Sequence, residues 1–109
     1  MAPNLEIIKN RSTFLYVKKK GKFLKGKCFN VNYLKDTNLE NAIYVGFIAS
    51  KKIGNAVKRN KAKRVMRELG RKVLRKYGKI NSYYVLIAKN SIFNTKMSEQ
   101  ENQLKELIT

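Results

Sequence analysis

Most of the ionisable side chains in this sequence, the ones that could take part in catalysis or binding, are basic. Its 109 residues include 25 Lys and Arg, seven Asp and Glu and no His, for a formal net charge of +18. General acid–base catalysis and metal-dependent hydrolysis need carboxylates or imidazoles that converge on one point. The seven carboxylates are scattered instead, at Glu6, Asp36, Glu40, Glu68, Glu99, Glu101 and Glu106. The sequence therefore predicts no catalytic or metal-ligating residues, and it disfavours a self-sufficient protein nuclease.

The basic residues are unevenly placed, because residues 51–79 hold thirteen of them. Self-repulsion on this scale destabilises a compact state unless a polyanion relieves it. Nucleic acid is the favoured polyanion. A membrane surface is disfavoured because the chain has no Trp and no apolar run of the roughly 20 residues that span a bilayer. A basic surface kept only for solubility would not be concentrated in one segment. We expect neither a membrane nor a small-molecule partner.

Helical periodicity separates the basic segment into two faces. A helix over residues 56–77 gathers its apolar residues on one stripe, made of Ala62, Val65, Met66, Leu69, Val73 and Tyr77. The opposite half holds Lys61, Lys63, Arg64, Arg67, Arg71 and Arg75. Like charges four residues apart repel by a few tenths of a kcal/mol per pair, and Glu68 relieves only one or two of them. The outward face is therefore predicted to bind phosphates of RNA or DNA.

The turn before this helix adds a natural anion site. Gly54 frees the backbone and Asn55 is a suitable N-cap, so Lys51 and Lys52 are expected beside amide donors at a helix N-terminus. Taken alone this motif is weak, since capped helix starts are common. Gly70, inside the predicted helix, costs about 1 kcal/mol relative to Ala and indicates close packing or a local bend.

The N-terminal half predicts a helix and three strands. Ser12 is the expected cap of a short helix that carries Phe14 and Val17 and ends at Gly21 in a left-handed conformation. Strands are expected at 23–25, 28–33 and 43–50. Alternation in the second strand places Phe29, Val31 and Tyr33 on one side and Cys28, Asn30 and Asn32 on the other. Gly46, in the third strand, indicates a bulge or a close approach.

The C-terminal part predicts a strand and a helix. Residues 83–88 are apolar on both faces, which favours a central strand. Ser98 and Glu101 form an expected capping box for a last helix that buries Leu104, Leu107 and Ile108. The predicted fold class is α+β, with one sheet and one domain over residues 1–109.

Two features of the sequence bear on the cellular compartment in which the protein is found. Cys28 is the only cysteine, so no intrachain disulfide forms, and a small buried apolar side chain is the favoured reading over a reactive thiol. The start of the chain lacks the pattern of a secretory signal. The expected location is the cytoplasm.

The segment "GFIASKKIGNAVKRNKAKRVMREL", residues 46–69, resembles the protein component of bacterial ribonuclease P. That family has an Arg-Asn-Arg element followed by Lys-Arg, matched here by Arg59, Asn60, Lys61, Lys63 and Arg64. The resemblance extends to "FLYVKKKGK" and "YYVLIAK", and so covers about residues 10–90. It implies the order αβββαβα, with the basic helix in an unusual left-handed β-α-β crossover.

The resemblance also implies a division of labour. The RNA subunit, with magnesium, cleaves the 5′ leader from precursor tRNA, and the protein binds both RNAs without a cofactor of its own. The implied contacts with the RNA subunit are Lys51, Lys52, Asn55, Arg59, Asn60, Lys61, Lys63, Arg64, Arg67 and Arg71. The implied leader contacts, in a cleft between the sheet and the first helix, are Phe14, Lys18, Asn30 and Asn32. Phe14 reads equally well as a core anchor of that helix.

Several positions depart from the family pattern. Lys61 replaces an arginine and so loses the planar fork that binds phosphate with two hydrogen bonds. Lys18 and Asn32 stand where relatives often have an aromatic residue, which favours electrostatic over stacking contact with the leader. Tyr83 stands where an acidic residue is common. The alternative function is a non-enzymatic RNA-binding protein of ribosomal type; a DNA-bending protein lacks a dimer signature here.

Overall fold

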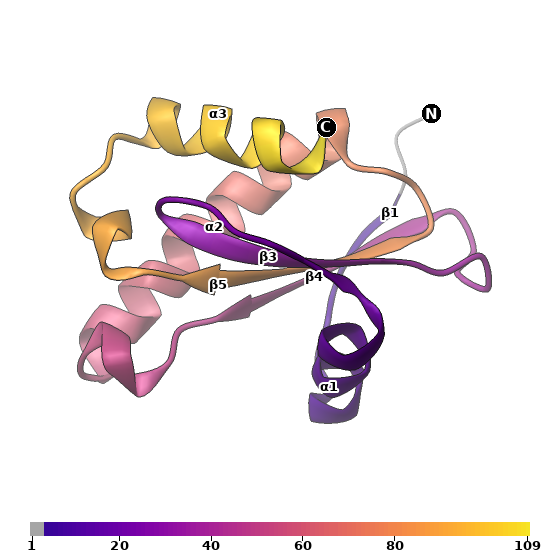
Figure 1. Cartoon of the computed structure of the whole chain (residues 1–109), viewed down its shortest axis with the longest axis horizontal. Coiled ribbons are helices and arrows are strands. Elements are labelled where there is room, and N and C mark those ends of the chain that lie inside the picture. Colours follow the sequence, from indigo (N-terminus) through magenta and orange to yellow (C-terminus); the bar gives the residue numbers. More distant parts are fainter. Residues whose placement is uncertain (1–3) are drawn as a thin grey trace.

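The computed structural model describes residues 4–109 and shows an α+β domain with three helices and one five-stranded mixed sheet (Figure 1). The elements are β1 (Asn4–Ile7), α1 (Arg11–Lys20), β2 (Lys22–Leu24), β3 (Phe29–Lys35), β4 (Ala42–Ile48), η1 (Lys51–Ile53), α2 (Ala56–Tyr77), β5 (Ser82–Ala88), η2 (Asn90–Phe93) and α3 (Met97–Ile108). The predicted fold class is confirmed, and so is the element order from α1 onward. The strand β1, which precedes α1, was not predicted.

The sheet has the strand order β1-β4-β5-β3-β2. The predicted central position of β5 is confirmed, since it pairs in parallel with β4 and antiparallel with β3. β1 adds a parallel edge strand beside β4, and β2 adds an antiparallel edge strand beside β3. The parallel pair β4 and β5 is joined through α2, as the family resemblance requires. The left-handed sense of that crossover stays a prediction.

The helices cover the two faces of the sheet unequally. α2 and α3 lie on one face and α1 lies alone on the other (Figure 1). Phe29 and Val31 of β3 are fully buried among the residues of α2 and α3, as their alternation predicts. On the α1 face a small cluster of Ile8, Val17 and Val85 holds the helix down. The fold therefore fixes α2 and α3 on an extensive core and α1 on a small one.

The start of α1 differs from its prediction. The helix begins at Arg11 after Asn10, so Ser12 lies inside the first turn and the predicted Ser12 cap is wrong. Gly21 does end the helix, but its φ of −86° is not left-handed. Space explains the glycine, because a Cβ atom there would lie 2.6 Å from the carbonyl oxygens of Val17 and Tyr33. Close approach of α1 to β3, rather than chain reversal, requires Gly21.

The start of α3 also differs. The helix begins at Met97 after Lys96 and has no side-chain cap, so the predicted capping box of Ser98 and Glu101 is wrong. Its buried side is as predicted, with Leu104 and Ile108 inside the core and Leu107 half-buried against it.

Cys28 is buried, as predicted, but it precedes β3 and shares the core cluster of Phe29 and Val31, so its predicted place on the opposite side of the strand is wrong. Its thiol donates a hydrogen bond to Thr95 Oγ1 at 3.1 Å. No helix within residues 4–109 is both long and apolar enough to cross a bilayer.

Candidate nucleic-acid interface

Local residues fix the position where α2 begins, through a glycine turn, a side-chain cap and a buried anchor. Gly54 has a φ of +136°, which a residue with a Cβ rarely adopts, and the Asn55 side chain accepts a hydrogen bond from the Lys58 amide at 3.0 Å. Ile53 is buried in the core and anchors η1 beneath the turn. Lys51 and Lys52 are therefore presented to solvent beside the first turn of α2, as predicted.

The two faces of α2 are confirmed. Ala62, Met66 and Leu69 have no exposed surface, and Val73 is 5% exposed. Val65 and Tyr77 are half-buried at the margin of this stripe. On the other side the side chains of Lys61, Arg64, Arg67, Arg71 and Arg75 are exposed, while Lys63 is half-buried. The core holds one face of the helix and directs the charge of the other outward.

Few of these charges are neutralised within the protein. Among residues 4–109 there are two ion pairs, Arg71 with Glu68 at 2.7 Å and Lys72 with Glu101 at 3.5 Å. Both are solvent-exposed, so each contributes at most about 1 kcal/mol. The remaining cations of the outer face have no carboxylate within salt-bridge distance. That face is therefore free to bind phosphate.

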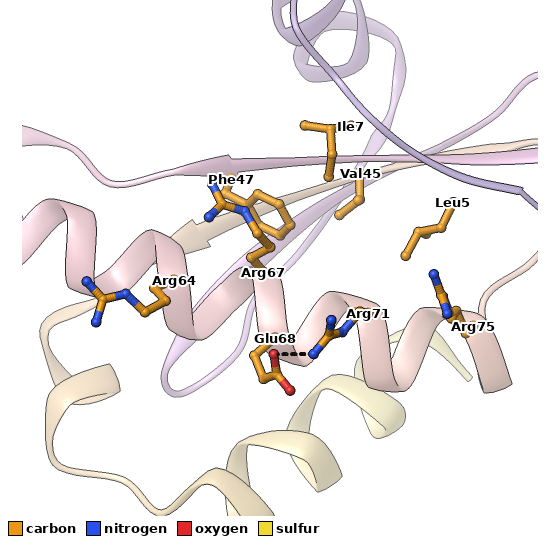
Figure 2. A pocket seen from close by; sticks show the side chains of 9 residues that line it. All are labelled: Leu5, Ile7, Val45, Phe47, Arg64, Arg67, Glu68, Arg71 and Arg75. Atoms are coloured by element: carbon orange, nitrogen blue, oxygen red, sulfur yellow. Dashed lines mark hydrogen bonds and ion pairs between the residues drawn. The ribbon is translucent and has the colours of Figure 1, made fainter.

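A groove runs between α2 and the edge of the sheet (Figure 2). Four arginines that follow one another along α2, Arg64, Arg67, Arg71 and Arg75, line one side of it together with Glu68, which pairs with Arg71. Leu5, Ile7, Val45 and Phe47 of β1 and β4 supply apolar surface opposite them. The hollow encloses about 270 Å³. Its chemistry suits an unpaired nucleotide, whose phosphate would contact the arginines and whose base would contact the apolar side.

Phe47 joins this groove to the core. The Arg67 guanidinium lies 6.0 Å from the centre of the Phe47 ring, a cation–π distance. The ring also packs against Gly70, where a Cβ atom would lie 3.4 Å from the nearest ring carbon. Gly70 thus sits in close packing, one of the two readings that the sequence offered.

The central motif lies on the first half of α2. Arg59 is half-buried and Asn60 is exposed. The Lys61 ammonium lies 6.0 Å from the centre of the Phe93 ring. Together with Lys51, Lys52 and Asn55, these residues form one surface at the N-terminal end of α2.

A second basic hollow lies beside α1, on the opposite face of the sheet. It encloses about 440 Å³ and is lined by Lys9, Arg11, Phe14, Leu15, Lys18 and Ile48. Three of these six residues are positive and none is negative. Phe14 has both of its expected positions at once, because its ring packs over Gly46 of β4 and also lines the hollow. The close approach predicted at Gly46 is this contact.

The two predicted asparagines do not line this hollow. The Asn30 side chain accepts a hydrogen bond from the Gly26 amide at 3.1 Å and so fixes the turn between β2 and β3. Asn32 is only 6% exposed, between Phe23 and Val85 of the neighbouring strands. Of the predicted leader contacts, the structure brings Phe14 and Lys18 together and leaves Asn30 and Asn32 apart from them.

Sequence reasoning missed several lining residues. Arg75 stands on the outward face that helical periodicity predicts, although the predicted contacts with the RNA subunit end at Arg71. Arg11 precedes Phe14 by three residues, and helix residues with this spacing lie on the same side, so the sequence could have placed Arg11 beside Phe14. Leu5 and Ile7 carry no local signal, because only the pairing of β1 with β4 brings them to α2.

Among the residues that the structure describes, no three His, Cys, Asp or Glu side chains converge on one point. Magnesium prefers oxygen ligands, chiefly carboxylates, water and phosphate. The described residues therefore do not fit a protein-held magnesium ion.

Comparison with known proteins identifies the chain. The family model "Ribonuclease P" matches residues 2–109. The ribonuclease P protein component of Ruegeria pomeroyi is 38% identical over 87 residues, covering 80% of this chain and 70% of the relative. That of Mycoplasma mycoides is 32% identical over 105 residues, covering 96% and 94%.

Solved structures agree. The RNase P protein of Staphylococcus aureus matches with a TM-score of 0.76 and 29% identity, covering 93% of this chain and 90% of that one. The RNase P protein of Thermotoga maritima matches with a TM-score of 0.78 and 26% identity, covering 94% of both. The chain therefore belongs to the bacterial ribonuclease P protein components, subunits of an endoribonuclease of tRNA processing.

Proposed function

We propose that the outer face of α2 binds the RNA subunit of ribonuclease P. The observation that carries this proposal is the excess of positive charge on that face, where the described cations outnumber the carboxylates paired with them. Phosphates relieve this repulsion, and the release of their counterions favours binding. The proposed contacts are Lys51, Lys52, Asn55, Arg59, Asn60, Lys61, Lys63, Arg64, Arg67 and Arg71.

The hollow beside α1 is the proposed site for the 5′ leader of precursor tRNA. Lys9, Arg11 and Lys18 supply positive charge there, and Phe14 supplies an aromatic ring. Contacts of this kind hold a single strand without reading its sequence, which suits an enzyme whose substrates have different leaders. Asn32 is kept as a predicted contact that requires local rearrangement, since it is nearly buried.

The two proposed sites lie on opposite faces of the sheet (Figure 1). The protein would thus hold the RNA subunit on the α2 face and the substrate on the α1 face. Its contribution is binding and orientation, which assist removal of the leader and give the mature 5′ end. The bond is cleaved by the RNA subunit in this proposal, and magnesium belongs to that subunit.

Cleavage of a precursor tRNA at low magnesium by a bacterial ribonuclease P RNA, with and without this protein, tests the proposal. We expect the protein to increase the rate and tighten substrate binding. A protein that binds the RNA but stimulates nothing would favour the alternative of a ribosomal-type RNA-binding protein. A protein that neither binds nor stimulates would overturn the proposal.

Matched variants locate the effect. Arg64→Ala with Arg67→Ala should abolish most of the stimulation. Lys96→Ala with Lys105→Ala removes the same charge from exposed positions beside and within α3 and should leave the stimulation in place. Equal losses in the two double variants would mean that only total charge matters.

A further inference from the structure

Three tyrosines from different elements meet on the flank of α1 that lies away from the Phe14 hollow. The rings of Tyr16 and Tyr83 are 6.1 Å apart, edge to face, and those of Tyr83 and Tyr44 are 5.6 Å apart. Tyr44 and Tyr83 are direct partners across β4 and β5. Tyr16 of α1 is 44% exposed, although burial would be favourable for so large a ring. This cluster, Tyr16, Tyr44 and Tyr83, is called the tyrosine platform below.

A hollow of about 370 Å³ opens beside the platform. Tyr44 and Tyr83 line it together with Lys9, Asn10 and Thr13 at the start of α1. Glu6 also lines it, and Lys9 is its one cation among the described residues. The hollow is therefore suited to a base or sugar more than to a phosphate.

Four lysines surround a neighbouring hollow of about 420 Å³. They come from the end of α1, from β2, from the end of β3 and from the loop after α2: Lys20, Lys22, Lys35 and Lys79. All four are exposed, and no acidic residue of the described chain lines this hollow. It adjoins the platform, since Leu34, which lines it, lies directly opposite Tyr83 across β3 and β5.

The platform is also connected to the proposed leader site. Lys9 lines both the Phe14 hollow and the hollow beside Tyr44 and Tyr83. A strand held by Phe14 and Lys18 can therefore pass the N-terminal end of α1 at Lys9, reach the tyrosines and end at the four lysines. Aromatic rings that alternate with clustered cations are the usual elements of single-strand binding sites.

We propose that the tyrosine platform and the lysine hollow bind the upstream nucleotides of the leader, beyond those held by Phe14. This inference rests on the proposed function, because it extends the leader site. Tyr16 and Tyr83 stack bases, and Lys20 and Lys35 contact phosphates. Leaders too short to pass Lys9 do not reach this second segment.

A leader-length series tests the inference with the reconstituted holoenzyme. Two precursor tRNAs with leaders of about 4 and about 16 nucleotides span the site sizes typical of single-strand binding domains. Dissociation constants are measured for wild type, Tyr16→Leu and Phe14→Ala. We expect Tyr16→Leu to weaken binding of the long leader by about 5- to 150-fold, the equivalent of one stacked base, and to leave the short leader unchanged. Phe14→Ala should weaken both.

The lysines provide an independent variant that alters no ring. Lys20→Gln with Lys35→Gln should weaken the long leader alone and reduce the salt dependence of its binding. Lys19→Gln with Lys96→Gln removes the same charge from exposed positions that line neither hollow and is the matched control.

The possible results separate the two proposals. Equal weakening of both leaders by Tyr16→Leu, or no weakening of either, would overturn the platform, and the same holds for the lysine pair. If wild-type affinity does not depend on the leader and Phe14→Ala changes nothing, the leader site itself fails.

Discussion

The two faces of the sheet differ in the size of the buried core that covers them. On the α2 and α3 face, eighteen of the described side chains form one buried cluster that includes Tyr84 and, from the apolar stripe of α2, Ala62, Met66, Leu69 and Val73. On the α1 face only Ile8, Val17 and Val85 are buried together. The hollow with Phe14, the tyrosine platform and the lysine hollow all adjoin α1.

This difference in core size bears on the proposal that one small domain binds two RNAs. A rigid support suits the α2 face, because a row of like charges keeps its geometry only if the helix beneath cannot move. A sparse core suits the α1 face, because unfilled space and half-buried rings leave surface for a flexible strand. The following predictions would sharpen or break this comparison.

The largest effect is expected on RNA binding by the α2 face. Replacing Arg59 and Arg64 together by Ala should weaken binding of the RNA subunit by about 100-fold or more, since each charge-assisted hydrogen bond contributes about 1.5–3 kcal/mol. The slope of log affinity against log salt should fall by roughly 0.7–0.9 for each lost phosphate contact. Lys18→Ala, on the other face, should leave this slope intact. An unchanged slope in the arginine variant would place the interface elsewhere.

Core truncation compares the two faces directly. Leu69→Ala should lower the free energy of unfolding by about 2–5 kcal/mol, because Leu69 is fully buried among side chains that cannot collapse into the cavity. Val17→Ala should cost about 1–2 kcal/mol, because α1 can settle against its small cluster. Urea denaturation measures both. A Val17 variant as costly as the Leu69 variant would contradict the comparison.

Gly46 of β4 and Gly70 of α2 should respond to substitution by alanine in opposite directions. At Gly46 a Cβ atom would overlap the Phe14 ring, so Gly46→Ala should displace that ring and cost about 1–3 kcal/mol. At Gly70 the added methyl makes ordinary contact with Phe47 and raises helix propensity, so Gly70→Ala should gain up to about 1 kcal/mol. Thermal denaturation checks the signs, and only the Gly46 variant should lose affinity for the leader. Destabilisation by Gly70→Ala would show that the Phe47 ring cannot move to make room for the added methyl group.

The last prediction concerns stability at alkaline pH. Burial raises the pKa of Tyr84 from 10.0 to about 12, despite the Lys79 amide, which donates to its hydroxyl oxygen at 2.9 Å and lowers the pKa. Between these values the unfolded chain loses the proton and the folded chain keeps it. The stabilisation is therefore complete below pH 10 and is lost as the pH rises to 12, by about 1–2 kcal/mol after allowance for solvent screening. Tyr84→Phe should flatten this part of the stability profile. An identical profile would assign the loss to other groups.

The basic helix could be predicted from the sequence because its determinants are local. The bounds of α2, the Asn55 cap and the buried stripe with Met66 and Leu69 all follow from periodicity and helix-start chemistry within one segment. The caps predicted at Ser12 and Ser98 failed for the opposite reason. The sheet and the core set where α1 and α3 begin, and neither start uses a side-chain cap.

The parts of the site that depend on strand pairing could not be predicted. Leu5 and Ile7 reach the arginine groove only because β1 pairs with β4 some forty residues later. Tyr16, Tyr44 and Tyr83 are far apart in sequence, and no spacing rule brings them together. The prediction that joined Asn30 to Phe14 rested on a shared face, but β5 lies between Asn30 of β3 and Ile48 of β4, which lines the Phe14 hollow.

The central place of β5 also orders events during synthesis. β5 occupies residues 82–88 and bonds to both β4 and β3, so neither partner has its full set of neighbours until about four-fifths of the chain exists. Until then α2 has no complete sheet to pack against, although all of its basic residues have already been synthesised. Contacts so distant in sequence slow folding. The nascent chain therefore exposes its basic segment before it can complete its fold. RNA can attract it by charge at that stage, before the folded binding surface exists.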